Sequence, residues 1–230
     1  MNCMTTLSET DLKAVSIFTG AGGLDIGFER AGFSIVSAVE LHPKYCETIR
    51  QNQEQHLLVP GTTRTYYEST LILNEDISNV SGQQLANGND NIDCLIGGPP
   101  CQSLSIFDHR GTLIYEYLRI LTELKPKTFL FENVRGLITA KGHKGIPGEV
   151  LSELLERFKN AGYNCRVALL NSADFGSYQR RVRCFIIGSR IAAAPDFPIP
   201  EYAENESFSL IPEYCRRKWN TLADFLAKYA

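Results

Sequence analysis

The fold class of this chain is decided by the stretch AVSIFTGAGGLD, residues 14–25. Its first five residues are mostly apolar and have the length of a buried strand. Three glycines follow, and a helical spacing of apolar residues begins at Leu24. A strand that turns through glycines into a helix is the opening unit of α/β sheets that bind a ligand at the carboxyl ends of their strands. The stretch therefore predicts an α/β domain with a ligand near the glycines.

The same alternation continues along the chain. Short apolar runs predict strands at residues 14–18, 34–39, 71–73, 92–96, 128–131, 166–170 and 184–187. Helical spacing predicts helices at residues 24–31, 43–53, 113–124, 149–161 and 222–229. Strands that alternate with helices predict a doubly wound, mostly parallel sheet with helices on both faces. In such a sheet, the residues just after each strand are the candidates for a functional site.

The composition is that of an ordinary folded domain. The 230 residues are 43% hydrophobic and 21% charged, with a formal net charge of −3, which excludes disordered and fibrous classes of protein. The length is sufficient for one α/β domain with a small appendage. No apolar run approaches the roughly 20 residues that span a bilayer, and no signal pattern opens the chain. We therefore expect a cytoplasmic protein without a membrane partner.

Cysteines and charges narrow the range of partners. The seven cysteines are scattered and have no C-x-x-C spacing, so they predict neither a disulfide framework nor a metal site. Residues 1–100 carry 5 basic and 12 acidic side chains, whereas residues 101–230 carry 18 and 14. We expect a polyanionic partner to bind the second part, where Arg180, Arg181 and Arg183 cluster.

The glycine turn differs from the dinucleotide fingerprint G-x-G-x-x-G, because the third glycine would fall on Asp25. A carboxylate there would repel a diphosphate, so NAD and FAD fit poorly. Glu40 ends the second predicted strand, where an acidic side chain can bind ribose hydroxyls. Together these features predict a cofactor that has a ribose and lacks a diphosphate. The alternative is that the glycines only turn the chain and that Glu40 is a solvated strand end.

Cys101 follows the fourth predicted strand, within the sequence GGPPCQS. Two prolines stiffen this turn, so Cys101 is a candidate nucleophile at the active edge of the sheet. Cys94 and Cys184 lie inside predicted strands and are expected in the core. A cysteine hydrolase is disfavoured, because His109 and His143 lie in loops and neither has a recognisable third partner.

Charged side chains border the later strands. Glu132 follows the apolar run 128–131, and a carboxylate that emerges from such a strand into a cleft can have a raised pKa and donate a proton near neutral pH. Asn133 could hold neighbouring backbone. Arg181 and Arg183 share one face of an extended chain, so both could point at one anion or base edge. The plain alternatives are a surface strand end and a solvated arginine stripe.

Four of these segments resemble successive motifs of the cytosine-5 DNA methyltransferase family. The family's cofactor loop F-x-G-x-G-G is matched by residues 18–23, P-C-Q by residues 100–102, E-N-V by residues 132–134 and Q-x-R-x-R by residues 179–183. The motifs follow the family's order and cover the chain from about residue 14 to residue 190. The resemblance implies the Rossmann-like fold of S-adenosylmethionine-dependent methyltransferases.

The resemblance also implies the cofactor, S-adenosylmethionine, and the residues of the site. The implied cofactor-binding residues are Phe18, Gly20, Gly22, Gly23, Glu40, Leu41, Asp76, Ile77, Pro100 and Leu113. The implied catalytic residues are Cys101, Glu132, Arg183 and Arg181. Cys101 would add to carbon 6 of a cytosine flipped out of double-stranded DNA, and Glu132 would hydrogen-bond or protonate ring nitrogen 3. The arginines would hold the base carbonyl or a nearby phosphate. DNA modification, including restriction–modification, is the implied setting.

The sequence departs from the family in two places. Only eight residues separate Cys101 from Arg110, where the family carries a longer loop. The family's target-recognition region and closing segment are absent after residue 190. We therefore expect a catalytic domain at residues 1–190, an extension at residues 191–230 that leads toward the missing region, and a second subunit that could carry target recognition. The alternatives are a non-catalytic S-adenosylmethionine-binding fragment or subunit, and a transfer-RNA cytosine methyltransferase.

Overall fold

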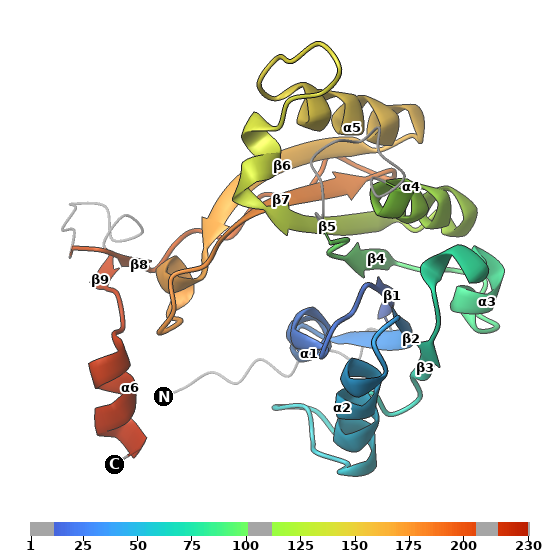
Figure 1. Cartoon of the computed structure of the whole chain (residues 1–230). Coiled ribbons are helices and arrows are strands. Elements are labelled where there is room, and N and C mark those ends of the chain that lie inside the picture. The colour runs from blue at the N-terminus through green and yellow to red at the C-terminus, as the bar shows by residue number, and fades with distance from the viewer. Residues whose placement is uncertain (1–11, 101–111, 206–215, 230) are drawn as a thin grey trace.

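The computed structural model describes residues 12–100, 112–205 and 216–229. Its centre is a seven-stranded sheet with the order β3-β2-β1-β4-β5-β7-β6 (Figure 1). The strands are β1 (Leu12–Ile17), β2 (Phe33–Glu40), β3 (Leu71–Asn74), β4 (Cys94–Gly97), β5 (Thr128–Val134), β6 (Asn164–Asn171) and β7 (Val182–Ser189). The α-helices between them are α1 (Gly23–Arg30), α2 (Pro43–Glu54), α3 (Gly82–Ala86), α4 (Thr112–Leu124) and α5 (Glu149–Asn160). Short 3₁₀ turns are η1 (Ile77–Asn79), η2 (Arg135–Thr139) and η3 (Ser172–Phe175), and the chain continues into β8 (Tyr202–Ala203), β9 (Arg217–Lys218) and α6 (Leu222–Tyr229).

The direction of the strands brings the predicted site residues to one edge. The five neighbours β3, β2, β1, β4 and β5 are parallel, so their carboxyl ends lie together. Strand β7 runs antiparallel to both β5 and β6. Its first residues therefore lie beside the last residues of β5, and Arg183 pairs with Val134. This reversal places Arg183, near the start of β7, next to Glu132, near the end of β5.

Helices cover the two faces of the sheet with different side chains. One face packs against α3, α4 and α5 in a large cluster that includes Tyr117, Phe129, Phe131 and Phe158. The ring centroids of Phe129 and Phe158 are 4.4 Å apart, and those of Tyr117 and Phe131 are 5.0 Å apart. The other face carries a smaller aliphatic cluster, against which Phe28 of α1 packs. Successive residues of a strand point to opposite faces, which is why β1 and β4 contribute to both clusters.

The predicted elements are all present, and their bounds differ in a few places. Strand β5 continues three residues beyond the predicted 128–131, because β7 pairs with it as far as Val134. Strand β4 begins at Cys94 rather than at residue 92. Cys94 and Cys184 are buried, as predicted. None of the helices in the described part of the chain is long and apolar enough to cross a membrane.

Candidate active site

The glycine loop after β1 is held by contacts within the protein. Gly20 and Gly22 have φ angles of 57° and 85°, in the left-handed region that favours glycine. A Cβ atom on Gly22 would lie 2.0 Å from the hydroxyl oxygen of Tyr67. The N–H of Gly20 donates to Glu40 Oε2 at 2.9 Å. The packing of Tyr67 therefore requires glycine at position 22, independently of any ligand.

Asp25, the residue that replaces the third glycine of the dinucleotide fingerprint, points into the protein. Its side chain is fully buried. It accepts hydrogen bonds from the Ser16 hydroxyl at 2.6 Å and from the Thr19 hydroxyl, and the Tyr67 hydroxyl lies 3.5 Å away. Burial raises the pKa of Asp25, and these hydrogen bonds partly oppose that rise. Asp25 thus ties the loop to the end of β1.

Glu29 and Tyr67 extend this buried network, and neither was predicted from the sequence. Glu29 Oε1 accepts a hydrogen bond from the Tyr67 backbone N–H at 2.7 Å. Burial raises the pKa of Glu29 to about 7. The available signal was the spacing of Asp25 and Glu29, because residues four apart lie on one face of a helix. The isolated position of Tyr67 in the irregular stretch 57–70 gave no comparable signal.

A first cavity, of about 610 Å³, opens at the ends of β2 and β3. Seven of the predicted cofactor-binding residues line it, namely Phe18, Glu40, Leu41, Asp76, Ile77, Pro100 and Leu113. Gly23 lines a neighbouring cavity, and Gly20 and Gly22 line neither of the two. Seven of the ten predicted cofactor-binding residues thus lie around one cavity, and the three glycines do not line it.

Two of the three carboxylates that line the first cavity, Glu40 and Asp76, accept hydrogen bonds from backbone N–H groups, and the third is that of Glu75. Glu40 accepts from Gly20 through Oε2 and from His42 through Oε1, both at 2.9 Å. Asp76 accepts from the Ser78 N–H and hydroxyl through Oδ1, and these bonds lower its pKa. Apolar walls with two fixed acceptors suit a nucleoside that carries ribose hydroxyls and a positively charged group. The residues present thus fit S-adenosylmethionine.

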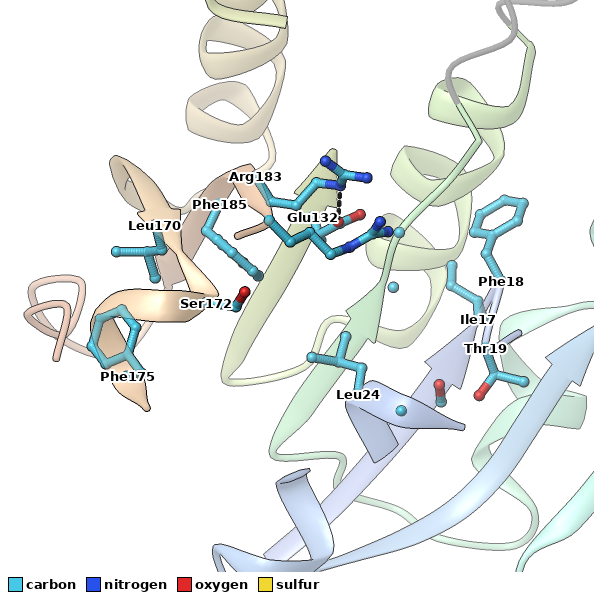
Figure 2. A pocket seen from close by; sticks show the side chains of 15 residues that line it. Ile17, Phe18, Thr19, Leu24, Glu132, Leu170, Ser172, Phe175, Arg183 and Phe185 are labelled. Carbon is cyan, nitrogen blue, oxygen red and sulfur yellow. Dashed lines mark ion pairs between the residues drawn. The ribbon is translucent and has the colours of Figure 1, made fainter. Parts of the chain in front are cut away.

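A second cavity, of about 410 Å³, shares lining residues with the first. Figure 2 shows the side chains that line the second cavity. Phe18 and Gly98 line both cavities. The second cavity is bordered by Glu132 from β5, by Arg183 from β7 and by Arg181 just before β7. The structure therefore brings together three of the four predicted catalytic residues, next to the predicted cofactor cavity.

Glu132 and Arg183 form an ion pair at the border of the second cavity. Arg183 Nε lies 3.1 Å from Glu132 Oε1, and the two side chains are 24% and 25% exposed (Figure 2). Arg183 also donates from Nη1 to the Val182 carbonyl at 2.8 Å. Burial raises the pKa of Glu132, whereas the charges of Arg183 and then Arg181 lower it. The net direction is upward, which favours the protonated form that can donate to a base nitrogen.

The turn that leads to Cys101 is anchored on β5. Asn133 is buried, and its Nδ2 donates to the Pro99 carbonyl at 3.1 Å, which is the contact with neighbouring backbone that we anticipated. A Cβ atom on Gly98 would lie 2.8 Å from Glu132 Oε2, so glycine allows the turn to approach this carboxylate. Cys101 follows directly after this turn and, like Arg110, lies outside the described residues.

Several residues of the second cavity were not predicted. They are Ser16, Ile17, Thr19, Leu24, Gly97, Gly98, Leu170, Ser172, Phe175 and Phe185. Strand β6 is parallel to β5, since both are antiparallel to β7, so its carboxyl end also lies at the active edge. The rule of inspecting residues after each strand would have found Ser172 and Phe175.

Comparisons with known proteins agree with this geometry. The family model for the C-5 cytosine-specific DNA methylases matches residues 12–228. The type II methyltransferase M.FnuDI of Fusobacterium nucleatum is 39% identical over 186 residues, which make up 78% of this chain and 47% of that protein. The type II methyltransferase M.AquIA of Picosynechococcus sp. is 38% identical over 205 residues, 83% of this chain and 77% of that protein. The chain thus spans about half the length of M.FnuDI and most of M.AquIA.

Solved structures show the same architecture. A DNA modification methyltransferase encoded within an E. coli prophage superposes with a TM-score of 0.62 and 28% identity, over 78% of this chain and 47% of that one. The S. pombe Dnmt2 methyltransferase, at 19% identity, shares the fold with a TM-score of 0.60 over 80% of this chain and 51% of that one. These neighbours confirm the predicted fold type, and S-adenosylmethionine is the cofactor of the family. The chain belongs to the C-5 cytosine-specific DNA methylase family.

Proposed function

We propose that this chain catalyses methyl transfer from S-adenosylmethionine to carbon 5 of a cytosine in DNA. The observation that carries the proposal is the junction of the two cavities at Phe18 and Gly98. The first cavity has the walls and acceptors of a nucleoside site, and the second is bordered by the Glu132–Arg183 pair. A donor and an acceptor base bound in adjoining cavities would be held side by side.

In the first cavity, the chain's own residues would bind and orient the cofactor. Glu40 would accept hydrogen bonds from ribose hydroxyls, while Asp76 and Ile77 would contact the adenine and Phe18 would border it. S-adenosylmethionine, when bound, supplies the methyl group from a positively charged sulfonium. The buried network around Asp25 would keep the glycine loop in one conformation throughout.

Cys101 is the proposed nucleophile for a base bound in the second cavity. Its thiolate would form a bond to carbon 6 of the cytosine, and the displaced electron pair would make carbon 5 nucleophilic. The methyl group would reach carbon 5 as its bond to the sulfonium breaks, which would leave a neutral thioether. The carbon 5 proton would then pass to water, and the electron pair of its bond would return to the ring and break the bond between carbon 6 and the Cys101 sulfur. Cys101 would leave as a thiolate, ready for another cycle.

Glu132 and the two arginines would stabilise this adduct. A protonated Glu132 would donate to ring nitrogen 3 as electron density builds in the ring, and its raised pKa supports that role. Arg183 and Arg181 would hold the base carbonyl or a nearby phosphate. Because these groups line a cavity, the target base would have to be flipped out of the duplex to reach them.

Double-stranded DNA is the proposed partner. We also propose that a further protein element recognises the target sequence. The excess of basic side chains in residues 101–230 supports contact with phosphates on the side of the second cavity. We assign the reading of the target sequence to a separate segment or to a second subunit. The length of M.FnuDI fits the first arrangement, and a relative as short as M.AquIA fits a catalytic unit of this size.

The decisive experiment is labelled-methyl transfer with a Cys101→Ser variant. We expect wild type to label cytosine in duplex DNA, and Cys101→Ser to lose turnover while retaining S-adenosylmethionine binding in equilibrium dialysis. The matched control is Cys165→Ser, at a half-buried position of β6 outside both cavities, which should keep its turnover.

Three outcomes would contradict the proposal. Full turnover in Cys101→Ser would contradict the assignment of Cys101 as the nucleophile. Cofactor binding by the wild type without transfer to any nucleic acid, with and without a recognition subunit, would favour the non-catalytic alternative. Methylation of transfer RNA without methylation of duplex DNA would identify the chain as a transfer-RNA cytosine methyltransferase.

A further inference from the structure

The segment around β8 and β9 returns to the loop that follows β6 (Figure 1). Its single tryptophan, Trp219, donates from Nε1 to Asp174 Oδ1 in η3 at 2.8 Å. The Glu201 N–H donates to the Asp174 carbonyl at 2.9 Å, and Asn220 Nδ2 donates to the Gly176 carbonyl at 2.7 Å. Three hydrogen bonds thus join residues near the end of the chain to η3 and the glycine after it.

The same loop forms one wall of the second cavity. Ser172 and Phe175 of η3 line it (Figure 2). Arg181, at the end of the loop, lines it as well. The loop is therefore in contact with the C-terminal segment on one side and with the candidate active site on the other.

A chain of hydrogen bonds connects Trp219 to Arg181. Asp174 Oδ1, which accepts from Trp219, also accepts from Asn171 Nδ2 at 3.3 Å. Asn171 Oδ1 in turn accepts from the backbone N–H of Arg181 at 3.2 Å. The Ser172 N–H donates to the Arg181 carbonyl at 3.1 Å, so the peptide groups on both sides of Arg181 are held.

A second contact joins Trp219 to the residue before Arg181. The guanidinium carbon of Arg180 lies 4.3 Å from the centroid of the Trp219 ring. Arg180 also forms an ion pair with Glu204 at 2.7 Å. The backbone at Arg180 and Arg181 is thus held from the Trp219 side through a ring contact and through the Asp174–Asn171 relay.

We propose that Trp219 is a positioning residue, which holds the loop 172–181 so that Arg181 faces the second cavity. This inference rests on the proposed function, because Arg181 is assigned to the base or a nearby phosphate there. Trp219 itself touches neither cavity. Its loss should therefore reduce turnover and leave cofactor binding in the first cavity unchanged.

The activity test uses Trp219→Phe, which keeps an aromatic ring beside Arg180 and removes the Nε1 donor. A single hydrogen bond contributes roughly a two- to tenfold effect, so we expect kcat for duplex DNA to fall about fivefold at an unchanged Kd for S-adenosylmethionine. Arg180→Gln should act in the same direction. The matched control is Arg157→Gln, because Arg157 likewise stacks on a ring, that of Tyr115, and pairs with a glutamate, Glu153, away from both cavities.

A spectroscopic test does not depend on activity. Trp219 is the chain's one tryptophan, so its fluorescence reports on this contact alone. We expect Asp174→Ala and Arg180→Gln to shift its emission to the red and to increase acrylamide quenching, and Arg157→Gln to change neither.

The two tests separate failure of this inference from failure of the proposed function. Unchanged kcat in Trp219→Phe, or cofactor affinity that falls in step with kcat, would overturn the positioning role. Unchanged fluorescence in both Asp174→Ala and Arg180→Gln would overturn the contact itself. Absence of methyl transfer in the wild type would instead overturn the proposed function, and the fluorescence test would still decide whether Trp219 holds the loop.

Discussion

The two halves of the sheet stabilise their site residues in opposite ways. In the half with β1, β2 and α1, polar groups are buried beneath the glycine loop, and Asp25, Glu29 and Tyr67 bond to one another and to backbone. In the half with β5, β6 and β7, the interior is an aromatic cluster, and the charged pair Glu132–Arg183 remains partly exposed at a cavity.

This difference agrees with the separate roles proposed above for the two halves. A loop that must keep one shape beside a cofactor is held by hydrogen bonds that are strong because they are buried. Side chains that exchange protons or contact a substrate stay partly exposed, and their support comes from apolar packing behind them. Substitutions in the first half should therefore mainly affect stability, and charged substitutions in the second should mainly affect turnover.

The largest expected effect is that of Glu132→Gln on turnover. Glutamine can still accept from Arg183 but cannot supply a proton, so we expect the methyl-transfer rate to fall about 10²- to 10⁴-fold. Unfolding temperature and cofactor affinity should stay within error of wild type. Glu156→Gln, at an exposed position of α5, is the control. A Glu132→Gln variant that loses stability and keeps its methyl-transfer rate would contradict the claim that charged substitutions in the half with β5, β6 and β7 mainly affect turnover.

Gly22→Ala should test the first half through stability. The added methyl would meet the Tyr67 hydroxyl at a position with φ of 85°, so we expect the free energy of unfolding to fall by about 3 kcal/mol. In the adjacent Gly23→Ala, the new Cβ would meet no atom within 4 Å, and stability should hold. Denaturant titrations of the two variants provide the measurement. Equal losses at both positions would refute the assigned role of Tyr67.

The buried carboxylate Glu29 predicts a pH dependence of stability. Its pKa is about 7 in the folded protein, against 4.5 for a glutamate side chain in water, so the folded state holds the proton more tightly. The contribution of Glu29 to stability should therefore be fully present below pH 4.5 and be lost as pH rises through 7, by on the order of 2 kcal/mol. Glu29→Gln keeps the acceptor for the Tyr67 N–H and should flatten this decline, whereas Glu54→Gln on the surface of α2 should not. Asp25, whose pKa is also raised, would retain part of the slope.

The smallest expected effect is that of Glu40→Ala on cofactor affinity. Loss of an acceptor for ribose hydroxyls should weaken S-adenosylmethionine binding about tenfold, with turnover at saturating cofactor little changed. Isothermal titration calorimetry gives the affinity. The control is Glu47→Ala, at an exposed position on α2 outside the first cavity. An unaltered affinity for S-adenosylmethionine in Glu40→Ala would contradict the assignment of Glu40 as the acceptor for the ribose hydroxyls.

Much of the fold and part of the site could be predicted from local patterns. Apolar spacing located every strand of the main sheet, and the rule that ligands lie after parallel strands led to Glu40 and Glu132, whereas Asp76 was expected only from the family resemblance. The role of Gly22 was less accessible, since the atom that requires glycine belongs to Tyr67, 45 residues away. Contacts that join an irregular segment to a distant loop leave no periodic signal in the sequence.

The sequence by itself determined the alternation of strands and helices, the glycine loop and the order of the motifs, because these depend on residues close together in the chain. Only the tertiary structure decided that Arg183 meets Glu132, since that contact requires β7 to run antiparallel to β5. Only the tertiary structure likewise placed Trp219 behind Arg181, through Asp174 and Asn171. Strand direction and loop docking are set by the packing of the whole domain, so side chains far apart in sequence become neighbours only when that packing is complete.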